Sequence, residues 1–149
     1  MKLKNKMTKV FRYVLIIFFL LNSNSFAKED FFAEAKNLFD SGKYEESKFL
    51  LQRNIVFHPK DSKSYLYLAK IYNHEKNRKE EEKNVNTVLL LEPKNEEAIY
   101  MLMEIELKKS NYMKVKNLSE TFLKICIELC DKNNLILKSL TNLEPKNES

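Results

Sequence analysis

Turn-forming residues are scarce in this sequence of 149 residues, which contains one glycine and three prolines. Many short strands joined by tight turns require more of these residues, so the composition excludes an all-β fold. A single glycine also excludes a glycine-rich phosphate-binding loop. Lysine, glutamate, leucine and asparagine are abundant instead, and they suit helices joined by short loops. The composition therefore predicts an all-α protein.

Residues that carry catalytic or metal chemistry are also few. The two histidines, His58 and His74, have no other ligand type at a metal-binding spacing. Cys126 and Cys130 are four residues apart, which is neither a redox-motif spacing nor part of a four-ligand set. No serine or cysteine has a recognisable catalytic partner. We therefore predict that the protein is not an enzyme and has no metal and no cofactor.

Acidic residues are missing from the first 27 positions, where five basic residues stand. These five account for the net charge of +5, because the rest of the chain holds 21 basic and 21 acidic residues. A phosphate-binding surface needs a local basic excess, and the rest of the chain has none overall. We therefore predict no nucleic-acid partner.

The first 27 residues have the layout of a secretory signal peptide, with a basic start, an apolar run over 13–21 and a polar end. The small residues Ser25 and Ala27 predict cleavage between Ala27 and Lys28. An uncleaved anchor is the alternative, but nine apolar residues are too short to span a hydrocarbon core of about 30 Å. We expect an exported protein, periplasmic or extracellular, that meets a membrane only through an uncleaved leader.

The remaining chain repeats itself with a period of about 34 residues, the spacing of Pro59 and Pro93. Asp61 and Asn95 follow these prolines and precede helical patterns, so both are predicted N-caps. Apolar residues recur in the same register, in the columns Phe31/Tyr65/Ile99, Ile55/Leu89/Leu123 and Phe57/Leu91/Ile125. Their spacing predicts six helices, and a last amphipathic helix over 133–143 is expected to cap the array. The six are 29–41, 44–57, 62–75, 78–91, 96–109 and 112–129.

This pattern resembles the tetratricopeptide repeat (TPR) family of helical hairpins, which has the same repeat length. The unit that matches best contains Tyr65, Leu68, Ala69, Tyr72, Val88, Leu89 and Pro93. The resemblance implies an all-α, right-handed superhelical stack of about three hairpins, 28–61, 62–95 and 96–129, followed by a capping helix and short tail over 130–149. Several positions that the family fills with apolar, small or aromatic residues differ here, namely Glu34, Asn54, Arg78, Glu81 and Glu106, and Ile127 replaces a third proline.

The resemblance also implies a binding groove lined by the first helix of each hairpin. Its residues would be Phe32, Lys36, Phe39, Tyr67, Lys70, Asn73, His74, Tyr100, Met101, Glu104 and Lys108. Aromatic side chains and methionine could hold apolar groups there, while Lys and Asn donate hydrogen bonds to a peptide. The predicted function is a non-catalytic adaptor of the cell envelope or periplasm that binds a peptide or helix of a partner protein.

Two alternatives remain open from the sequence. The chain could be a structural protein that forms homo-oligomers through its terminal helix or open repeat edge. Cys126 and Cys130 are interpreted as two small core residues of one helix, with a disulfide between them as the second interpretation.

Overall fold

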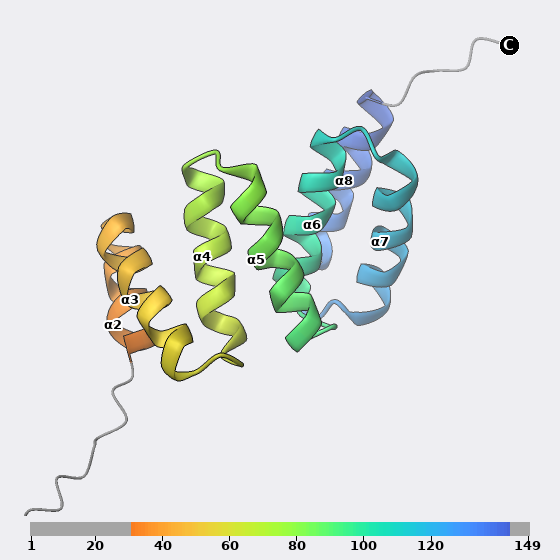
Figure 1. Ribbon diagram of the computed structural model, residues 1–149. Helices are drawn as coiled ribbons and strands as arrows, with labels where there is room; N and C mark the ends of the chain where they lie inside the picture. Colours follow the sequence, from red (N-terminus) through yellow and green to blue (C-terminus); the bar gives the residue numbers. More distant parts are fainter. Residues whose placement is uncertain (1–30, 144–149) are drawn as a thin grey trace, which may run out of the picture.

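The computed structural model describes residues 31–143, which form helices and no strand (Figure 1). The predicted signal peptide and its cleavage site at Ala27 and Lys28 lie outside these residues. The helices are α2 (Phe31–Asp40), α3 (Tyr44–Phe57), α4 (Ser62–His74), α5 (Arg78–Leu91), α6 (Glu96–Lys108), α7 (Tyr112–Ile125) and α8 (Cys130–Leu143).

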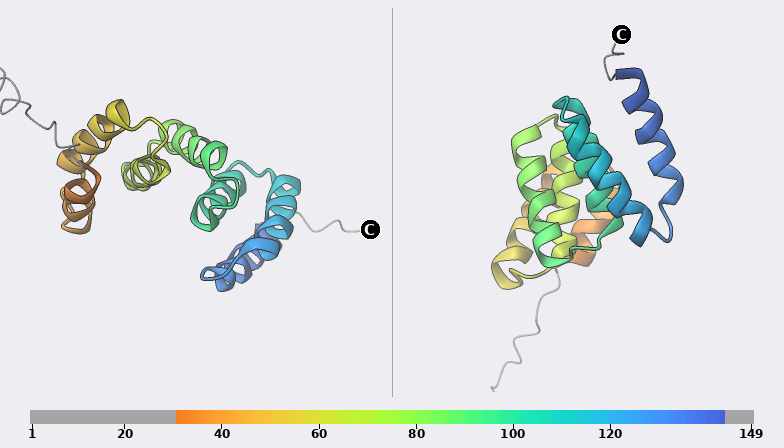
Figure 2. Two further views of the ribbon diagram at one scale, coloured as in Figure 1. Left: turned by 90° about the horizontal axis from the view of Figure 1, so that it is seen from below. Right: turned by 90° about the vertical axis from the view of Figure 1, so that its right-hand side faces the viewer.

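The helices pair into three hairpins, α2–α3, α4–α5 and α6–α7, and α8 packs on the last hairpin. Viewed along the helices, the hairpins form an arc (Figure 2). The first helices α2, α4 and α6, together with α8, line its inner side, and the second helices lie on its outer side. The predicted all-α stack of hairpins with a terminal helix is confirmed.

The same tight turn closes each hairpin and recurs at the interval of the sequence repeat. Gly42, Lys76 and Ser110 have positive φ angles of 75°, 58° and 59°. The amide after each of them donates to a carbonyl five residues back, as Lys43 does to Leu38 at 2.9 Å. This Schellman arrangement ends the first helix of each pair. Glycine suits the left-handed backbone best, so the lysine and serine are held there by the surrounding hairpin.

Side-chain caps start the first helices of the second and third hairpins. The Asp61 carboxylate accepts a hydrogen bond from the Ser64 amide at 3.3 Å, and the Asn95 side chain accepts one from the Ala98 amide at 3.0 Å. These bonds satisfy amides that have no partner within the helix. Both predicted N-caps are confirmed.

The apolar core is divided along the arc, because each hairpin packs mainly on its neighbours. One cluster joins the first hairpin to α4 through Ala35, Leu51, Leu68 and Ile71. A second joins the middle hairpin to α6 and includes Val85, Val88, Ala98 and Leu102. The third joins α8 to the last hairpin and includes Met103, Val115, Phe122, Ile136 and Leu140.

Glu106 is one of the residues that depart from the family pattern, and its side chain is 3% exposed. The carboxylate accepts hydrogen bonds from Lys114 Nζ at 2.8 Å and from Asn111 Nδ2 at 2.9 Å. Burial raises the pKa of Glu106, but these bonds and the nearby lysine charges outweigh it, so the net pKa lies below its usual value. The buried charge is therefore paired within its own hairpin.

Two other departures from the pattern are also buried with partners. Glu81 is 2% exposed and accepts a hydrogen bond from Asn73 Nδ2 at 2.6 Å. Asn54 is equally buried, and its Nδ2 donates to Asp61 and to Ser64, both at 2.9 Å. Polar contacts thus replace some of the small and apolar contacts expected inside these hairpins. Glu34 and Arg78, by contrast, are exposed.

The sixth helix is shorter than predicted and the last helix is longer. The chain leaves the helical conformation at Cys126, whose φ and ψ are −64° and 140°. The next helix begins at Cys130, one repeat length after the start of α6 at Glu96. The helix predicted over 112–129 is therefore wrong beyond Ile125, and the capping helix predicted over 133–143 begins three residues earlier.

A carboxylate from another helix explains this break. The Glu96 side chain accepts hydrogen bonds from the backbone amides of Ile127, Glu128 and Leu129 at 2.7, 3.1 and 3.0 Å. These bonds lower the pKa of Glu96. Local sequence spacing does not reveal such a contact, because Glu96 and the three amides are 31 to 33 residues apart in the chain.

Cys126 and Cys130 form a disulfide across the loop that Glu96 binds. Their Cα atoms are 5.3 Å apart, within the usual range for a bridge. The preferred interpretation, two small core residues on one continuous helix, is contradicted, and the second interpretation describes the structure. The reason is the break between α7 and α8, which frees the two side chains from a common helical geometry.

Candidate protein-binding face

The predicted groove residues lie on α2, α4 and α6, the helices along the inner side of the arc (Figure 2). Met101 is the one predicted groove residue that is buried: it is 5% exposed and belongs to the core between the second and third hairpins. Its prediction as a binding residue is therefore wrong. We call the other ten the inner face: Phe32, Lys36, Phe39, Tyr67, Lys70, Asn73, His74, Tyr100, Glu104 and Lys108.

Aromatic rings connect the first two hairpins on the inner face. The Tyr67 ring lies edge-on to Phe32 and to Phe39, with centroid distances of 5.4 and 5.0 Å. All three side chains are half-buried. Such edge-to-face pairs are favourable and hold ring orientations. These rings therefore pack the hairpins together while keeping part of their surface accessible to a partner.

Two further rings, those of Tyr44 and His74, join this aromatic group. Tyr44, at the start of α3, lies edge-on to Phe39 at 5.4 Å. Its ring also contacts the His74 ring, with centroids 4.3 Å apart. His74 is exposed and Tyr44 is half-buried. Sequence reasoning missed Tyr44, since it belongs to a second helix and the resemblance assigns binding to first helices alone.

Two lysines place positive charge beside these rings. Lys36 Nζ is 2.6 Å from an Asp40 carboxylate oxygen, a contact that raises the pKa of Lys36. Lys70 Nζ is 2.8 Å from Glu97 and lies 4.6 Å from the centroid of the Tyr67 ring. Both ammonium groups sit at the edge of apolar surface. An acidic or carbonyl group of a ligand would compete with the carboxylates for them.

Tyr100 continues the inner face onto the third hairpin. Its hydroxyl donates a hydrogen bond to Glu104 at 2.9 Å. Partial burial, followed by this bond and the carboxylate charge, raises the pKa of Tyr100 to about 12. Lys132 Nζ lies 5.7 Å from the centroid of the Tyr100 ring. The tyrosine is therefore neutral over the working pH range and is in contact with the last helix.

The terminal helix also contributes to the inner side of the arc, which the sequence prediction did not include. α8 starts one repeat length after α6 and lies on the same side as α2, α4 and α6 (Figure 2). In this register, Leu135 and Lys138 occupy the columns of Tyr67 and Lys70, and both are exposed. The repeat register would have identified them if it had been extended through the capping helix.

The remaining predicted residues contribute less. Asn73 is half-buried and its side-chain amide donates a hydrogen bond to the buried Glu81, so this amide stabilises the hairpin and is not available to a partner. Lys108 is exposed at the end of α6. Among residues 31–143, no three His, Cys, Asp or Glu side chains gather where they could hold a metal ion. None of the helices in that range is long and apolar enough to cross a membrane.

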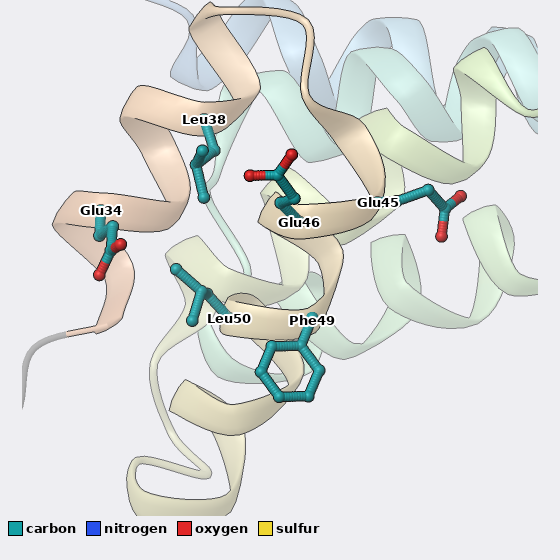
Figure 3. A pocket seen from close by; sticks show the side chains of 6 residues that line it. All are labelled: Glu34, Leu38, Glu45, Glu46, Phe49 and Leu50. Atoms are coloured by element: carbon teal, nitrogen blue, oxygen red, sulfur yellow. The ribbon is translucent and has the colours of Figure 1, made fainter.

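Two surface hollows lie away from the inner face. One is at the link between α5 and α6, lined by Glu92, Pro93, Lys94 and Asn95. The other is at the first hairpin, where it is lined by Glu34, Leu38, Glu45, Glu46, Phe49 and Leu50 (Figure 3). The inner face presents half-buried aromatic rings and charged groups, a composition that suits contact with a protein segment.

No protein-family model and no curated protein matches the sequence. The structure is similar to the crystal structure of the type III secretion translocator chaperone SycD of Yersinia enterocolitica, in a form described as an alternative dimer. The TM-score is 0.67 and the sequence identity is 18%, with 86% of this chain and 99% of that chain covered. This likeness shows a TPR-like helical fold.

The comparison also corrects the predicted location. We predicted export to the periplasm or the extracellular space, but the similar structure is that of a chaperone for a secretion translocator. A match of this kind points away from an exported protein. The prediction of an exported protein is therefore wrong, and with it the envelope location of the predicted adaptor.

Proposed function

We propose that this protein is a non-catalytic adaptor that holds an extended or helical segment of a partner protein along its inner face. The observation that carries the proposal is the aromatic group of Phe32, Phe39 and Tyr67 with Lys70 over its edge. Half-buried rings offer large contact area at a small entropic cost, and adjacent cations donate hydrogen bonds. The TPR-like repeat units 28–61, 62–95 and 96–129 are part of the same proposal.

The chemistry of the inner face favours a segment with apolar anchors flanked by acidic or amide groups. The rings would contact the anchors, and Lys36 and Lys70 would exchange their present carboxylate partners, Asp40 and Glu97, for groups of the ligand. The similar structure is that of a chaperone for a secretion translocator, which supports a protein as the ligand class. A secretion substrate before its transport is one such partner.

The test is affinity capture with the tagged full chain, followed by mass spectrometry. We expect a reproducible partner that is lost with the double variant Tyr67→Ala/Lys70→Glu and reduced with Lys70→Glu alone. The matched control is Met113→Ala/Lys83→Glu on outer helices, where both side chains are about 70% exposed, and it should keep the partner. Circular dichroism checks that each variant stays helical.

Two outcomes would contradict the proposal. Recovery of no protein other than the chain itself would remove the partner, and equal loss of the partner in the outer-helix control would remove the inner face as its site. A variant that loses its helical spectrum is replaced by Lys70→Glu, which changes a surface ion pair and leaves the aromatic packing in place.

A second candidate function is self-assembly, which the exposed apolar residues of α8 favour. Leu135 and Leu143 are each 55% exposed on that helix, and the similar structure is described as a dimer. Light scattering after size exclusion measures the mass directly. A dimer that becomes a monomer on Leu135→Glu would support this function, and a monomer at all concentrations would contradict it.

A further inference from the structure

The hollow on the first hairpin has an apolar floor and an acidic rim. Leu38 and Leu50 are half-buried, Phe49 is 62% exposed, and Glu34, Glu45 and Glu46 line the remainder. Figure 3 shows Glu46 and Leu50 on α3 pointing toward Glu34 and Leu38 on α2, with the Phe49 ring below α3 and Glu45 turned outward. The lining residues belong to α2 and α3, the hairpin at one end of the array (Figure 1).

Later hairpins cover the equivalent positions. Leu68 and Leu102 stand one and two repeat lengths after Glu34 in the same column and are 4% and 5% exposed. In each case the second helix of the preceding hairpin packs there, α3 on α4 and α5 on α6. The first hairpin has no such helix among the described residues. Its hollow is therefore the place of a missing second helix.

The chain has one segment that fits this place by register. Shifting the bounds of α3, Tyr44–Phe57, back by one repeat length gives residues 10–23, with the sequence VFRYVLIIFFLLNS. This window contains the whole apolar run 13–21. The buried α3 positions Ser47, Leu51 and Asn54 correspond to Tyr13, Ile17 and Leu20, all with large side chains. Residues 24–30 would connect this segment to α2. They are seven residues, more than the four that link α3 to α4, so the connection is long enough.

Charge also matches in this arrangement. Second helices run parallel to one another, because each is separated from the next by one antiparallel helix. The start of a helix over 10–23 would therefore lie near the start of α3, which carries Glu45 and Glu46 in its first turn. Lys9 and Arg12 stand at the start of the segment, with three further lysines before them. Opposite charges in these positions favour docking.

We propose that residues 10–23 form a helix that docks in the hollow lined by Leu38, Leu50 and Phe49 and caps the first hairpin. The segment then acts as the second helix of a repeat that precedes the first hairpin. It buries the apolar end that a repeat array otherwise exposes to solvent or to a second copy. This role explains the apolar run without export, and it leaves the inner face accessible to a partner.

Photo-crosslinking of the full chain tests the proposal. Leu38→p-benzoylphenylalanine places a reactive ketone in the hollow, and the control Leu137→p-benzoylphenylalanine places it on α8, where the leucine is 37% exposed. Illumination followed by peptide mass spectrometry locates the links. We expect position 38, but not position 137, to link to residues 10–23 of the same chain. An equal mixture of ¹⁵N-labelled and unlabelled chains should give no mixed-isotope pairs.

Three results would overturn the proposal: mixed-isotope pairs, which identify a second copy in the hollow; links from position 38 that avoid 10–23; or a purified chain whose mass begins at Lys28. A second measurement does not depend on the photoprobe. Amide hydrogen exchange should show slow exchange over 10–23, lost in Glu45→Lys/Glu46→Lys and kept in Glu120→Lys on α7. Rapid exchange over 10–23 in the unsubstituted chain would equally refute a docked helix.

Discussion

Tyr67 of the second hairpin lies edge-on to Phe39 of the first, with ring centroids 5.0 Å apart. The contact serves the fold and the proposed binding face at the same time, because both rings are only half-buried. A substitution at Tyr67 therefore changes stability as well as binding. Lys70, whose ammonium group lies over the Tyr67 ring, is the better position for separating the two effects.

Tyr67→Ala should lower the free energy of unfolding by about 2 kcal/mol. Complete removal of a buried aromatic ring costs about 3 to 5 kcal/mol, and this ring is half-buried. Urea denaturation followed by circular dichroism measures the change. Met113→Ala, which removes a side chain that is 68% exposed, should change the value by less than about 0.5 kcal/mol. Equal effects of the two substitutions would contradict the aromatic packing described here.

Lys114→Met should destabilise the third hairpin by about 1 to 2 kcal/mol, because it removes a charged hydrogen-bond donor from the buried Glu106 carboxylate. The matched control is Lys83→Met, which breaks an exposed pair with Glu80 and should cost less than about 1 kcal/mol. Chemical denaturation of both variants at neutral pH provides the comparison. A Lys114→Met protein as stable as the control would show that Glu106 does not depend on this lysine.

Stability should fall as the pH is lowered below about 4.5, the usual pKa of a glutamate. The pKa of Glu92 is lowered by a hydrogen bond from Ser62 and then by one from Asn95. The pKa of Glu106 is also lowered, despite its burial. A carboxyl group with a lowered folded pKa stabilises the fold above its unfolded pKa, and the contribution is lost as pH falls through the folded value.

Thermal melts between pH 7 and pH 3 measure this dependence. The melting temperature of the unsubstituted protein should decrease through the acidic range, and Glu92→Gln should decrease less, since one of the titrating groups is removed. If the two proteins follow the same curve, Glu92 does not contribute to the acid sensitivity.

Reduction of the Cys126–Cys130 bridge should lower the free energy of unfolding by about 2 kcal/mol, the loop-closure estimate for so short a loop. The effect should be concentrated at the junction of α7 and α8. Hydrogen exchange with and without reductant measures it locally, and Cys126→Ser/Cys130→Ser should not respond to reductant. Unchanged exchange around residues 126–130 after reduction would show that Glu96 alone maintains the junction.

The sequence predicts most of the helical framework because the signals that specify it are local. Apolar spacing places α3 and α5 at their observed bounds. Together with the caps Asp61 and Asn95, it also places α4 and α6 to within one residue of their observed ends. The same local signals fail at the end of α7. The decisive contact there comes from Glu96, at the start of the preceding helix α6.

The candidate face was predicted less completely, also for physical reasons. A residue's position in the repeat indicates which helix it belongs to, but it does not indicate how deeply a neighbouring hairpin covers its side chain. Met101 was therefore assigned to the surface although it is 5% exposed. Conversely, Tyr44 and Lys132 reach the face through ring contacts, which depend on the packing between hairpins. Buried polar residues such as Glu106 also find their partners only after the hairpins have formed.

The central claim, that the inner face holds a partner segment, is tested most directly by calorimetric titration of the captured partner's binding segment into the full chain. We predict a one-to-one complex whose affinity falls at least tenfold, or about 1.4 kcal/mol, with Lys70→Glu. The outer-face variant Lys83→Glu should bind like the unsubstituted protein. Equal affinity of the unsubstituted chain and Lys70→Glu, or equal weakening by both substitutions, would contradict the claim.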